Sequence, residues 1–443
     1  MQRLRAVLLA SAALVLTSCS GGHKATQRLP ATPCGTYDGR GCAPARERVD
    51  LVVPTFSHPT EITNPLFPIS RLRSAVLLGH EGPKPFRSET TLLPVTDKIR
   101  WNGRQIETLV SQYVAYADGR LEEVARDRYA QADDGSVWYF GEDVMDYERG
   151  AVALTEGTWL AGREGPASMI MPAHPKVGDV FRLENIPGIV FEEVHVGAVG
   201  RTVQATAGPV DGAILAEELH SDGSYDHKIY APGYGEFRTT GSGDLEALAV
   251  AVPADTLPGP APSALNDLLT GSIGILELAR LGDWEGVPSV LARMQREWSA
   301  LLTRRRPPLV PSRLSGALAR LARGAKQRKV ERIAQPSIDV AQSTLDLLLR
   351  YRPPVEINAA RFRLWTQQLR VDAAAQDLAG VTGDVAVLEW IRDRFASALP
   401  AIARADFDNR VRDLRTAVDA RNLPAAADHA ARLASRLRIL GLA

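Results

Sequence analysis

The sequence predicts an α+β protein with two domains: an N-terminal, mostly antiparallel β domain, built as a curved sheet, a sandwich or a half-barrel, and a C-terminal all-α helical bundle. Three observations predict this division. Runs rich in β-branched and aromatic residues give way to a helical spacing of apolar residues. A proline-rich linker, residues 253–263, lies between the two patterns. The formal charge also changes sign: residues 50–263 contain 17 Lys and Arg against 31 Asp and Glu, whereas residues 264–443 contain 28 against 19.

The N-terminus has the three parts of a signal peptide. Arg3 and Arg5 precede an apolar stretch over residues 6–16, which is too short to span a bilayer, and Leu16-Thr-Ser-Cys19 follows. These last four residues resemble the lipobox of bacterial lipoproteins, and the resemblance implies cleavage before Cys19 and a lipid thioether on it. We therefore expect a signal peptide over residues 1–18 and an extracytoplasmic protein anchored to the cell membrane by lipid. The alternative is an ordinary secretory peptide with an incidental cysteine.

Residues 19–50 are predicted to form a flexible tether, because they are rich in glycine, proline and small polar residues. Cys34 and Cys42 lie within this segment, and an oxidising compartment favours a small disulfide loop between them. We expect no metal site on these two thiols, because no third cysteine or histidine lies between them or just after them.

The β domain is predicted over residues 51–252. Its strand signals are runs of β-branched and aromatic residues at 108–116, 136–140 and 189–196. Asp-Gly pairs at 118–119, 134–135 and 222–223 suit the tight turns of β-hairpins. Strands joined by such turns pair in an antiparallel sheet.

The helical domain is predicted over residues 264–443, with about six to eight amphipathic helices. Apolar residues recur at steps of three and four in two stretches, Trp284, Val287, Leu291, Met294, Trp298 and Leu301, then Val385, Leu388, Ile391, Phe395 and Leu399. Asn422 with Pro424 marks one helix start, and Asp283 marks another that Pro288 moves about a turn later. The phrases Leu281-Gly-Asp-Trp284 and Ala420-Arg-Asn-Leu423 precede similar helices, either as a degenerate repeat or by chance.

The densest candidate for chemistry lies at residues 138–159. Carboxylates beside aromatic rings bind cations, grip sugars or transfer protons. The candidate binding residues, with one histidine from a nearby loop, are Glu142, Asp143, Glu156, Trp138, Trp159 and His174. The alternative is an acidic strand end with aromatic core residues, since clusters of charge usually lie on solvated faces.

Three segments around this cluster resemble an uncharacterised β-rich domain of secreted bacterial proteins. They are Asn64-Pro-Leu-Phe-Pro68, Met171-Pro-Ala-His-Pro175 and Lys228-Ile-Tyr-Ala-Pro-Gly233. The resemblance covers about residues 56–250 and implies no activity.

The spacing of the histidines argues against the common metal sites. Glu192 and His195 match the Glu-x-x-His motif of di-iron proteins, but that motif needs one helical face and this segment has strand character. In a strand, Glu192 and His195 point to opposite faces, whereas Glu193 shares a face with His195. His174 and His227 are the two histidines that can still reach the acidic cluster. No serine-hydrolase, zincin, phosphate-loop or dinucleotide motif occurs, and we expect no metal or other cofactor.

Basic residues concentrate in the first half of the helical domain. The four that define this basic face are Arg320, Arg323, Arg328 and Arg332. Such a face contacts anionic lipid or an acidic protein partner, or it is a solvated arginine-rich surface. We expect no nucleic acid as a partner outside the cell.

Two functions from different classes are compatible with these features. The favoured one is a membrane-anchored lipoprotein that binds a ligand or partner without catalysis. The alternative is an extracytoplasmic enzyme that acts on a sugar or a metal-bound substrate through Glu142, Asp143 or Glu156. Geometry separates them, because an enzyme needs two such carboxylates, or a carboxylate and a histidine, facing one cavity, whereas a binding protein needs only a lined concavity.

Overall fold

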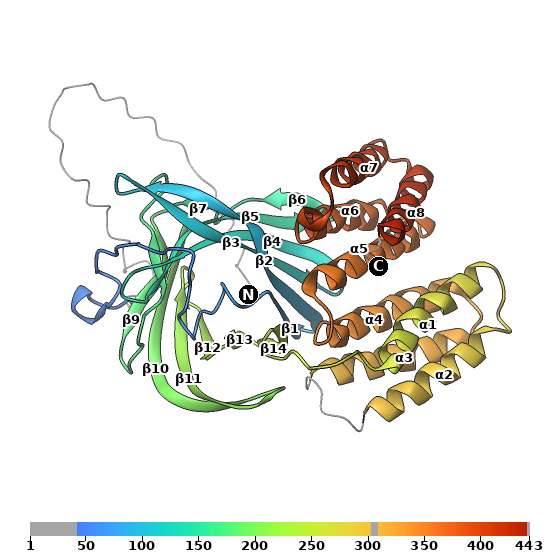
Figure 1. Ribbon diagram of the computed structural model, residues 1–443, viewed down its shortest axis with the longest axis horizontal. Helices are drawn as coiled ribbons and strands as arrows, with labels where there is room; N and C mark the ends of the chain where they lie inside the picture. The colour runs from blue at the N-terminus through green and yellow to red at the C-terminus, as the bar shows by residue number, and fades with distance from the viewer. Residues whose placement is uncertain (1–41, 303–308, 441–443) are drawn as a thin grey trace.

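A computed structural model describes residues 42–302 and 309–440 of the chain (Figure 1). The predicted signal peptide, the lipid anchor at Cys19 and the predicted disulfide residue Cys34 lie outside the described residues. Cys42 lies within them and is disulfide-bonded. In the described part of the chain, no helix combines the length and the apolar character needed to cross a membrane.

The described strands form one open antiparallel sheet, which confirms the predicted class of the first domain. Its spatial order is β6-β5-β4-β3-β2-β1-β14-β13-β12-β11-β10-β9, with β7 and β8 each paired to β5. The strands are β1 (Ser74–Glu81), β2 (Lys84–Trp101), β3 (Arg104–Ala117), β4 (Arg120–Gln131), β5 (Val137–Glu148), β6 (Ala151–Leu154), β7 (Trp159–Leu160), β8 (Ser168–Met171), β9 (Val180–Ile186), β10 (Val190–Ala205), β11 (Gly208–His220), β12 (Tyr225–Ala231), β13 (Gly235–Gly241) and β14 (Asp244–Val252).

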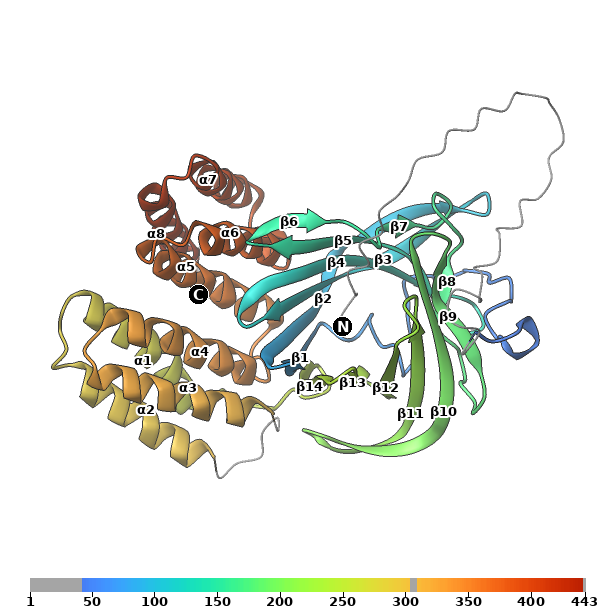
Figure 2. The same ribbon diagram turned by 180° about the vertical axis from the view of Figure 1, so that it is seen from behind.

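The sheet curls into a trough, seen from both sides in Figures 1 and 2. The three predicted Asp-Gly turns join β3 to β4, β4 to β5 and β11 to β12. At the first turn, Asp118 has a φ of 49° and Gly119 a φ of 75°. Both angles lie in the left-handed region, as a two-residue hairpin loop requires.

In the described part of the chain, eight helices follow the sheet, within the predicted range of six to eight. Residues 253–262, within the proline-rich segment, connect β14 to the first helix. The helices are α1 (Ser263–Arg280), α2 (Val287–Leu301), α3 (Leu309–Lys326), α4 (Val330–Leu348), α5 (Pro354–Ala374), α6 (Leu378–Asp393), α7 (Ala401–Asp419) and α8 (Leu423–Ile439), with a short 3-10 helix, η3 (Ala396–Ala398), after α6.

Both predicted apolar stripes pack into the core, with Trp284 only partly buried, but their helices are shorter than the stripes. Helix α2 begins at Val287 with Pro288 in its first turn, so Trp284 precedes it. Helix α6 ends at Asp393, and Phe395 and Leu399 are buried beyond its end. The apolar spacing of three and four residues therefore extends past the ends of the helices, into segments that pack on the core but are not α-helical.

The helices form four hairpins with the same connection. In each hairpin one residue has a left-handed φ: Gly282 (78°), Arg328 (49°), Gln376 (60°) and Arg421 (55°). Three of these residues are followed by a side chain that accepts a hydrogen bond from the amide three residues on, namely Asp283, Asp377 and Asn422. The two matching phrases in the sequence are therefore members of a structural repeat of helical hairpins.

The helices pack on the face of β1–β4 and β14 that is opposite to the trough. Val76 and Leu78 of β1 belong to one apolar core with α1–α4. Val114 and Tyr116 of β3 belong to a second core with α5–α8, where the Tyr116 ring stacks on Trp365. The neighbouring side chains of these strands point into the trough, because successive residues of a strand alternate between its two faces.

Candidate functional site

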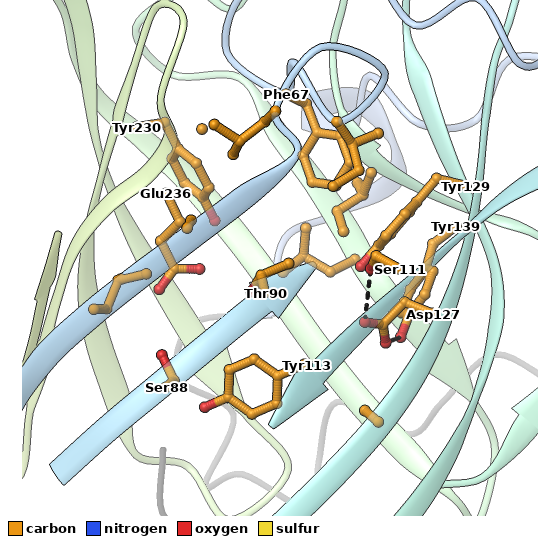
Figure 3. Close-up of a pocket in the computed structure, with 18 of the residues that line it drawn as sticks. Phe67, Ser88, Thr90, Ser111, Tyr113, Asp127, Tyr129, Tyr139, Tyr230 and Glu236 are labelled. Atoms are coloured by element: carbon orange, nitrogen blue, oxygen red, sulfur yellow. Dashed lines mark hydrogen bonds between the residues drawn. The ribbon is translucent and has the colours of Figure 1, made fainter. Parts of the chain in front are cut away.

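The trough encloses a cavity of about 210 Å³ (Figure 3). Ser88 of β2, together with Ser111 and Tyr113 of β3, projects into it, while Val114 and Tyr116 of β3 face the helices. Polar residues thus recur at every second position on the concave face. Apolar residues such as Ile69, Leu77 and Leu183 complete the lining, so polar groups and apolar surface alternate around the cavity.

Five tyrosines line the cavity: Tyr113, Tyr129, Tyr139, Tyr230 and Tyr234. The rings of two of them, on adjacent strands, are stacked with their centroids 4.9 Å apart. Burial raises the pKa of all five above the usual value for tyrosine. All five hydroxyls are therefore neutral at physiological pH and present uncharged aromatic faces.

The cavity is also lined by carboxylates, Glu123, Asp127, Glu142, Glu184, Glu192, Glu236 and Glu246. Neutral donors orient two of them: the Tyr139 hydroxyl donates to Asp127 over 2.7 Å, and the Trp159 indole donates to Glu184 over 2.7 Å. Ser111 donates a further bond to Asp127 over 3.2 Å (Figure 3).

Among the described lining residues, Lys228 is the one with a positive charge. Its Nζ lies 3.0 Å from Oε2 of Glu218 and 3.7 Å from Oε2 of Glu236. Burial opposes the charge on Lys228, but these two carboxylates outweigh that effect and raise its pKa well above the usual value. Lys228 therefore remains an ammonium and is held on the β11–β13 wall.

Glu246 is a lining carboxylate whose charged form is disfavoured by its surroundings. It is 4% exposed, it accepts a hydrogen bond from Ser88 on Oε1, and its Oε2 has no hydrogen-bond partner in the described part of the chain. Burial, and then the nearby Glu236, raise its pKa to about 7. A carboxylate in this position gains from any cation that enters the cavity.

Of the six predicted binding residues, Glu142 alone reaches the cavity, and a β-bulge places it there. Asp127 pairs with Glu142, and Tyr129 pairs with Tyr139. Between these two pairs, β5 contains one residue more than β4. The extra residue puts Tyr139 and Glu142 on the same face, although simple alternation would separate them. Gly141 accommodates the bulge with a φ of 117°.

The other five predicted residues lie elsewhere. Trp138 and Trp159 are buried core side chains. Asp143 forms an ion pair of 2.6 Å with Arg128, and Glu156 and His174 are exposed on connections between strands. Thus Glu142, Asp143 and Glu156 do not converge, because strand alternation and the turn after β6 send them to different surfaces.

The two histidines that could have reached the acidic cluster do not line the cavity. His174 is exposed, and the mostly exposed His227 lies 3.5 Å from Glu217. The segment with Glu192 and His195 is a strand, as predicted, and His195 lies 3.0 Å from Glu193 on the same face.

A histidine that the sequence analysis did not single out lies at one end of the trough. His220 lies within 3.8 Å of three carboxylates, Glu192, Asp226 and Glu218. Burial opposes its charge, but hydrogen-bonding contacts with Asp226 and Glu192 raise its pKa to about 10. These residues come from neighbouring strands, so they do not form a short motif that could be recognised in the sequence.

The predicted basic face is exposed but partly paired. Arg320 lies 2.8 Å from Asp339, and Arg328 lies 2.9 Å from Glu285. The side chains of both ion pairs are accessible to water. Exposed pairs of this kind contribute little to stability. Contact of this face with lipid or an acidic partner stays a prediction.

No family model matches the chain, and no curated protein is significantly similar to it. The site is therefore defined by its own geometry. A period-two recurrence of serine, threonine, tyrosine and acidic residues on β2–β4 is the sequence signal that could have located it. The cluster around His220 left no comparable signal.

Proposed function

We propose that this protein binds a small organic cation, such as a primary amine or a quaternary ammonium ion, in the trough of its sheet. The observation that carries the proposal is Glu246, a buried carboxylate with one oxygen lacking a hydrogen bond, beside Glu236 and near the Tyr113 ring. A cation between these groups gains charge-assisted contacts and the attraction of aromatic faces. The cavity of about 210 Å³ suits a ligand of only a few heavy atoms.

The proposal is tested by calorimetric titration of the full-length protein with ethylammonium, 1,4-butanediamine and tetramethylammonium chlorides, with acetate and ethanol as anionic and neutral probes. We expect the cations to bind and the other probes not to bind. Glu246→Gln should weaken cation binding about tenfold, since a hydrogen bond to a charged group is worth about 1.5–3 kcal/mol. The matched control, Glu156→Gln, removes the same charge from an exposed turn and should change nothing. An equal loss of cation affinity in Glu246→Gln and Glu156→Gln would contradict the proposal.

Binding should also depend on pH. The pKa of Glu246 is about 7, so this carboxylate is mostly protonated at pH 6 and mostly charged at pH 8. Cation affinity should therefore rise between these two pH values in the wild type and rise less in Glu246→Gln. The charged groups that face Glu246 in the trough are Glu236, which raises the pKa of Glu246, and Lys228, which lowers it.

The carboxylates named for the enzymatic alternative do not meet in one cavity. That alternative required two of Glu142, Asp143 and Glu156, or one of them and a histidine, to face one cavity. In the structure Glu142 faces the cavity, whereas Asp143 pairs with Arg128 and Glu156 is exposed. A binding protein needs only the lined concavity that the trough provides.

The binding domain is displayed, in our proposal, outside the cytoplasm by a lipid on Cys19. The support is the charged start, short apolar stretch and Leu16-Thr-Ser-Cys19 ending of the sequence. Cys19→Ala should move the protein from the membrane fraction to the soluble extracytoplasmic fraction, as followed by immunoblotting after a high-salt wash. Cys42→Ala should leave the protein in the membrane fraction. A Cys19→Ala protein that still sediments with washed membranes would contradict the anchor.

A further inference from the structure

Strands β10, β11 and β12 bring one histidine and three carboxylates to the same face of the sheet. Glu192 of β10 lies directly opposite His220 of β11. Glu218 precedes His220 by two residues and therefore shares its face. Asp226 of β12 lies directly opposite Glu218. The register of three neighbouring strands thus assembles the group without any help from a loop.

The ligand atoms of this group have the spacing of a metal site. One ligand atom from each of Glu192, Glu218 and His220 lies within 4.8 Å of the other two. The Nδ1 atom of the imidazole lies 3.5 Å from Glu192, and its Nε2 atom lies 3.3 Å from Asp226 and 3.8 Å from Glu218. Ligand atoms on a tetrahedral ion with bonds of about 2.1 Å are roughly 3.4 Å apart, so the distance between Nε2 and Glu218 needs little adjustment.

Two polar atoms of the group make no hydrogen bond to the described residues, although Nε2 of His220 lies 3.3 Å from Oδ2 of Asp226. Glu218 is fully buried, and in the described part of the chain neither its Oε1 nor the Nε2 of His220 has a hydrogen-bond partner. Buried polar atoms without partners are rare because each costs free energy. Both atoms belong to the pair that lies 3.8 Å apart, so one ion between them satisfies both.

We propose that Glu192, Glu218 and His220 bind a divalent transition-metal ion such as Zn²⁺ or Mn²⁺. An imidazole with carboxylates selects such ions over Mg²⁺ and Ca²⁺, which prefer oxygen ligands alone. Asp226 and Lys228 complete the surroundings. Nε2 of His220 faces both Oε1 of Glu218 and Asp226, and Nδ1 lies 3.5 Å from Glu192. Lys228 contacts Oε2 of Glu218 and leaves Oε1 toward the histidine.

The competing interpretation is a protonated imidazole held by three carboxylates, with no affinity for metals. A titration of the full-length, chelator-treated protein with ZnCl₂ and MnCl₂ separates the two, with CaCl₂ and MgCl₂ as further probes. We expect one equivalent of zinc or manganese to bind, and calcium and magnesium to bind at least tenfold more weakly. Co²⁺ should give the visible absorption bands of an ion with low coordination number and a nitrogen ligand.

The chain offers a matched control on the same strand. His195 and Glu193 form a second histidine–carboxylate contact, 3.0 Å long, on the opposite face of β10. His220→Ala and Glu218→Gln should each abolish stoichiometric binding, and Asp226→Asn should weaken it by about tenfold to a hundredfold. His195→Ala should bind the metal like the wild type. Circular dichroism establishes that each variant is folded.

Two results would overturn the metal site: a wild-type protein that binds no stoichiometric transition metal, or a folded His220→Ala protein that binds it as tightly as the wild type. The inference does not rest on the proposed organic ligand, and the variants keep the two apart. Glu246→Gln should leave metal affinity within about twofold of the wild type, and His220→Ala should leave ethylammonium binding in place. Loss of only one of the two activities therefore identifies which proposal fails.

Discussion

Glu246 shows how a single side chain links stability to the site. A glutamate has an ordinary pKa of 4.5, whereas in the folded protein burial and Glu236 raise the pKa of Glu246 to about 7. Between these values the folded state keeps a proton that the unfolded chain has released. The free energy of unfolding should therefore fall as pH rises from about 4.5 to 7 and stay low above that, by at most about 3 kcal/mol.

Glu246→Gln removes this titration, so it should stabilise the protein at pH 8 by about 2 kcal/mol and change little at pH 4. Urea unfolding at the two pH values measures the difference. The exposed Glu156→Gln serves as the control for the loss of one charge. An equal gain at both pH values would show that packing, rather than the buried charge, explains the effect.

At the scale of residues, the sequence located one lining residue and missed the rest. Glu142 was predicted because acidic and aromatic residues are dense around it in the sequence. Its position in the cavity, however, depends on the bulge at Gly141, which inverts the alternation of β5. Tyr113, Glu246 and His220 are far apart along the chain, and only the pairing order of the sheet brings them to one trough.

The bulge of β5 is an element whose geometry is testable through one glycine. A Cβ on Gly141 would lie 2.2 Å from the carbonyl oxygen of Trp159, at a φ of 117° that side chains rarely adopt. Gly141→Ala should lower the free energy of unfolding by on the order of 3 kcal/mol. Gly103→Ala is the control, because its φ of 75° is similarly unusual but its Cβ would meet open space; it should cost about 1 kcal/mol.

Thermal unfolding by circular dichroism compares the two glycine variants directly. If they lose the same stability, the close approach of β7 to Gly141 does not constrain the bulge. A second readout follows from function, since a disturbed bulge also displaces Glu142 from the cavity. Ethylammonium affinity should therefore fall in Gly141→Ala and stay unchanged in Gly103→Ala.

Elements with strong local signals were predicted well. The three Asp-Gly hairpins and the start of α8 at Asn422 depend on backbone angles and capping bonds that neighbouring residues determine. The end of α6 was not predicted, since Phe395 and Leu399 keep an apolar period that tertiary packing uses without a helix. The helical-hairpin repeat was visible only in two of its four connections, because arginine and glutamine adopt the left-handed angle that glycine adopts at residue 282.

At the scale of the whole molecule, the switch of period near residue 253 predicted the order of sheet and helices. It could not show how closely the two are joined. The outer face of β1–β4 and β14 shares both of its apolar cores with the helices. An apolar strand face looks the same in a sequence whether another sheet, a helix or a partner covers it.

A buried ionic network crosses the same interface. Glu89 of β2 forms ion pairs with Arg87 (2.6 Å), Arg361 of α5 (3.3 Å) and Arg394 after α6. Asp346 of α4 pairs with Arg87 at 2.7 Å and with Arg361 at 2.9 Å. Burial opposes the charges on both carboxylates, but the guanidinium groups outweigh it and hold both pKa values below the ordinary range. Stability from this network should be complete above about pH 4.5 and decline as pH falls below it.

Because cores and network are shared, we expect sheet and helices to unfold together in one transition. Glu89→Gln leaves buried guanidinium groups without their common carboxylate and should cost about 3–5 kcal/mol. Glu285→Gln breaks the pair between Arg328 and Glu285, in which the Glu285 side chain is 84% exposed. It should lower the free energy of unfolding by less than about 1 kcal/mol. Urea unfolding tests the single transition and the two variants. It is followed by tryptophan fluorescence and by far-ultraviolet circular dichroism, which reports the helices. Separate transitions for the two probes, with Glu89→Gln shifting only one of them, would show instead that the linker joins two domains that fold independently.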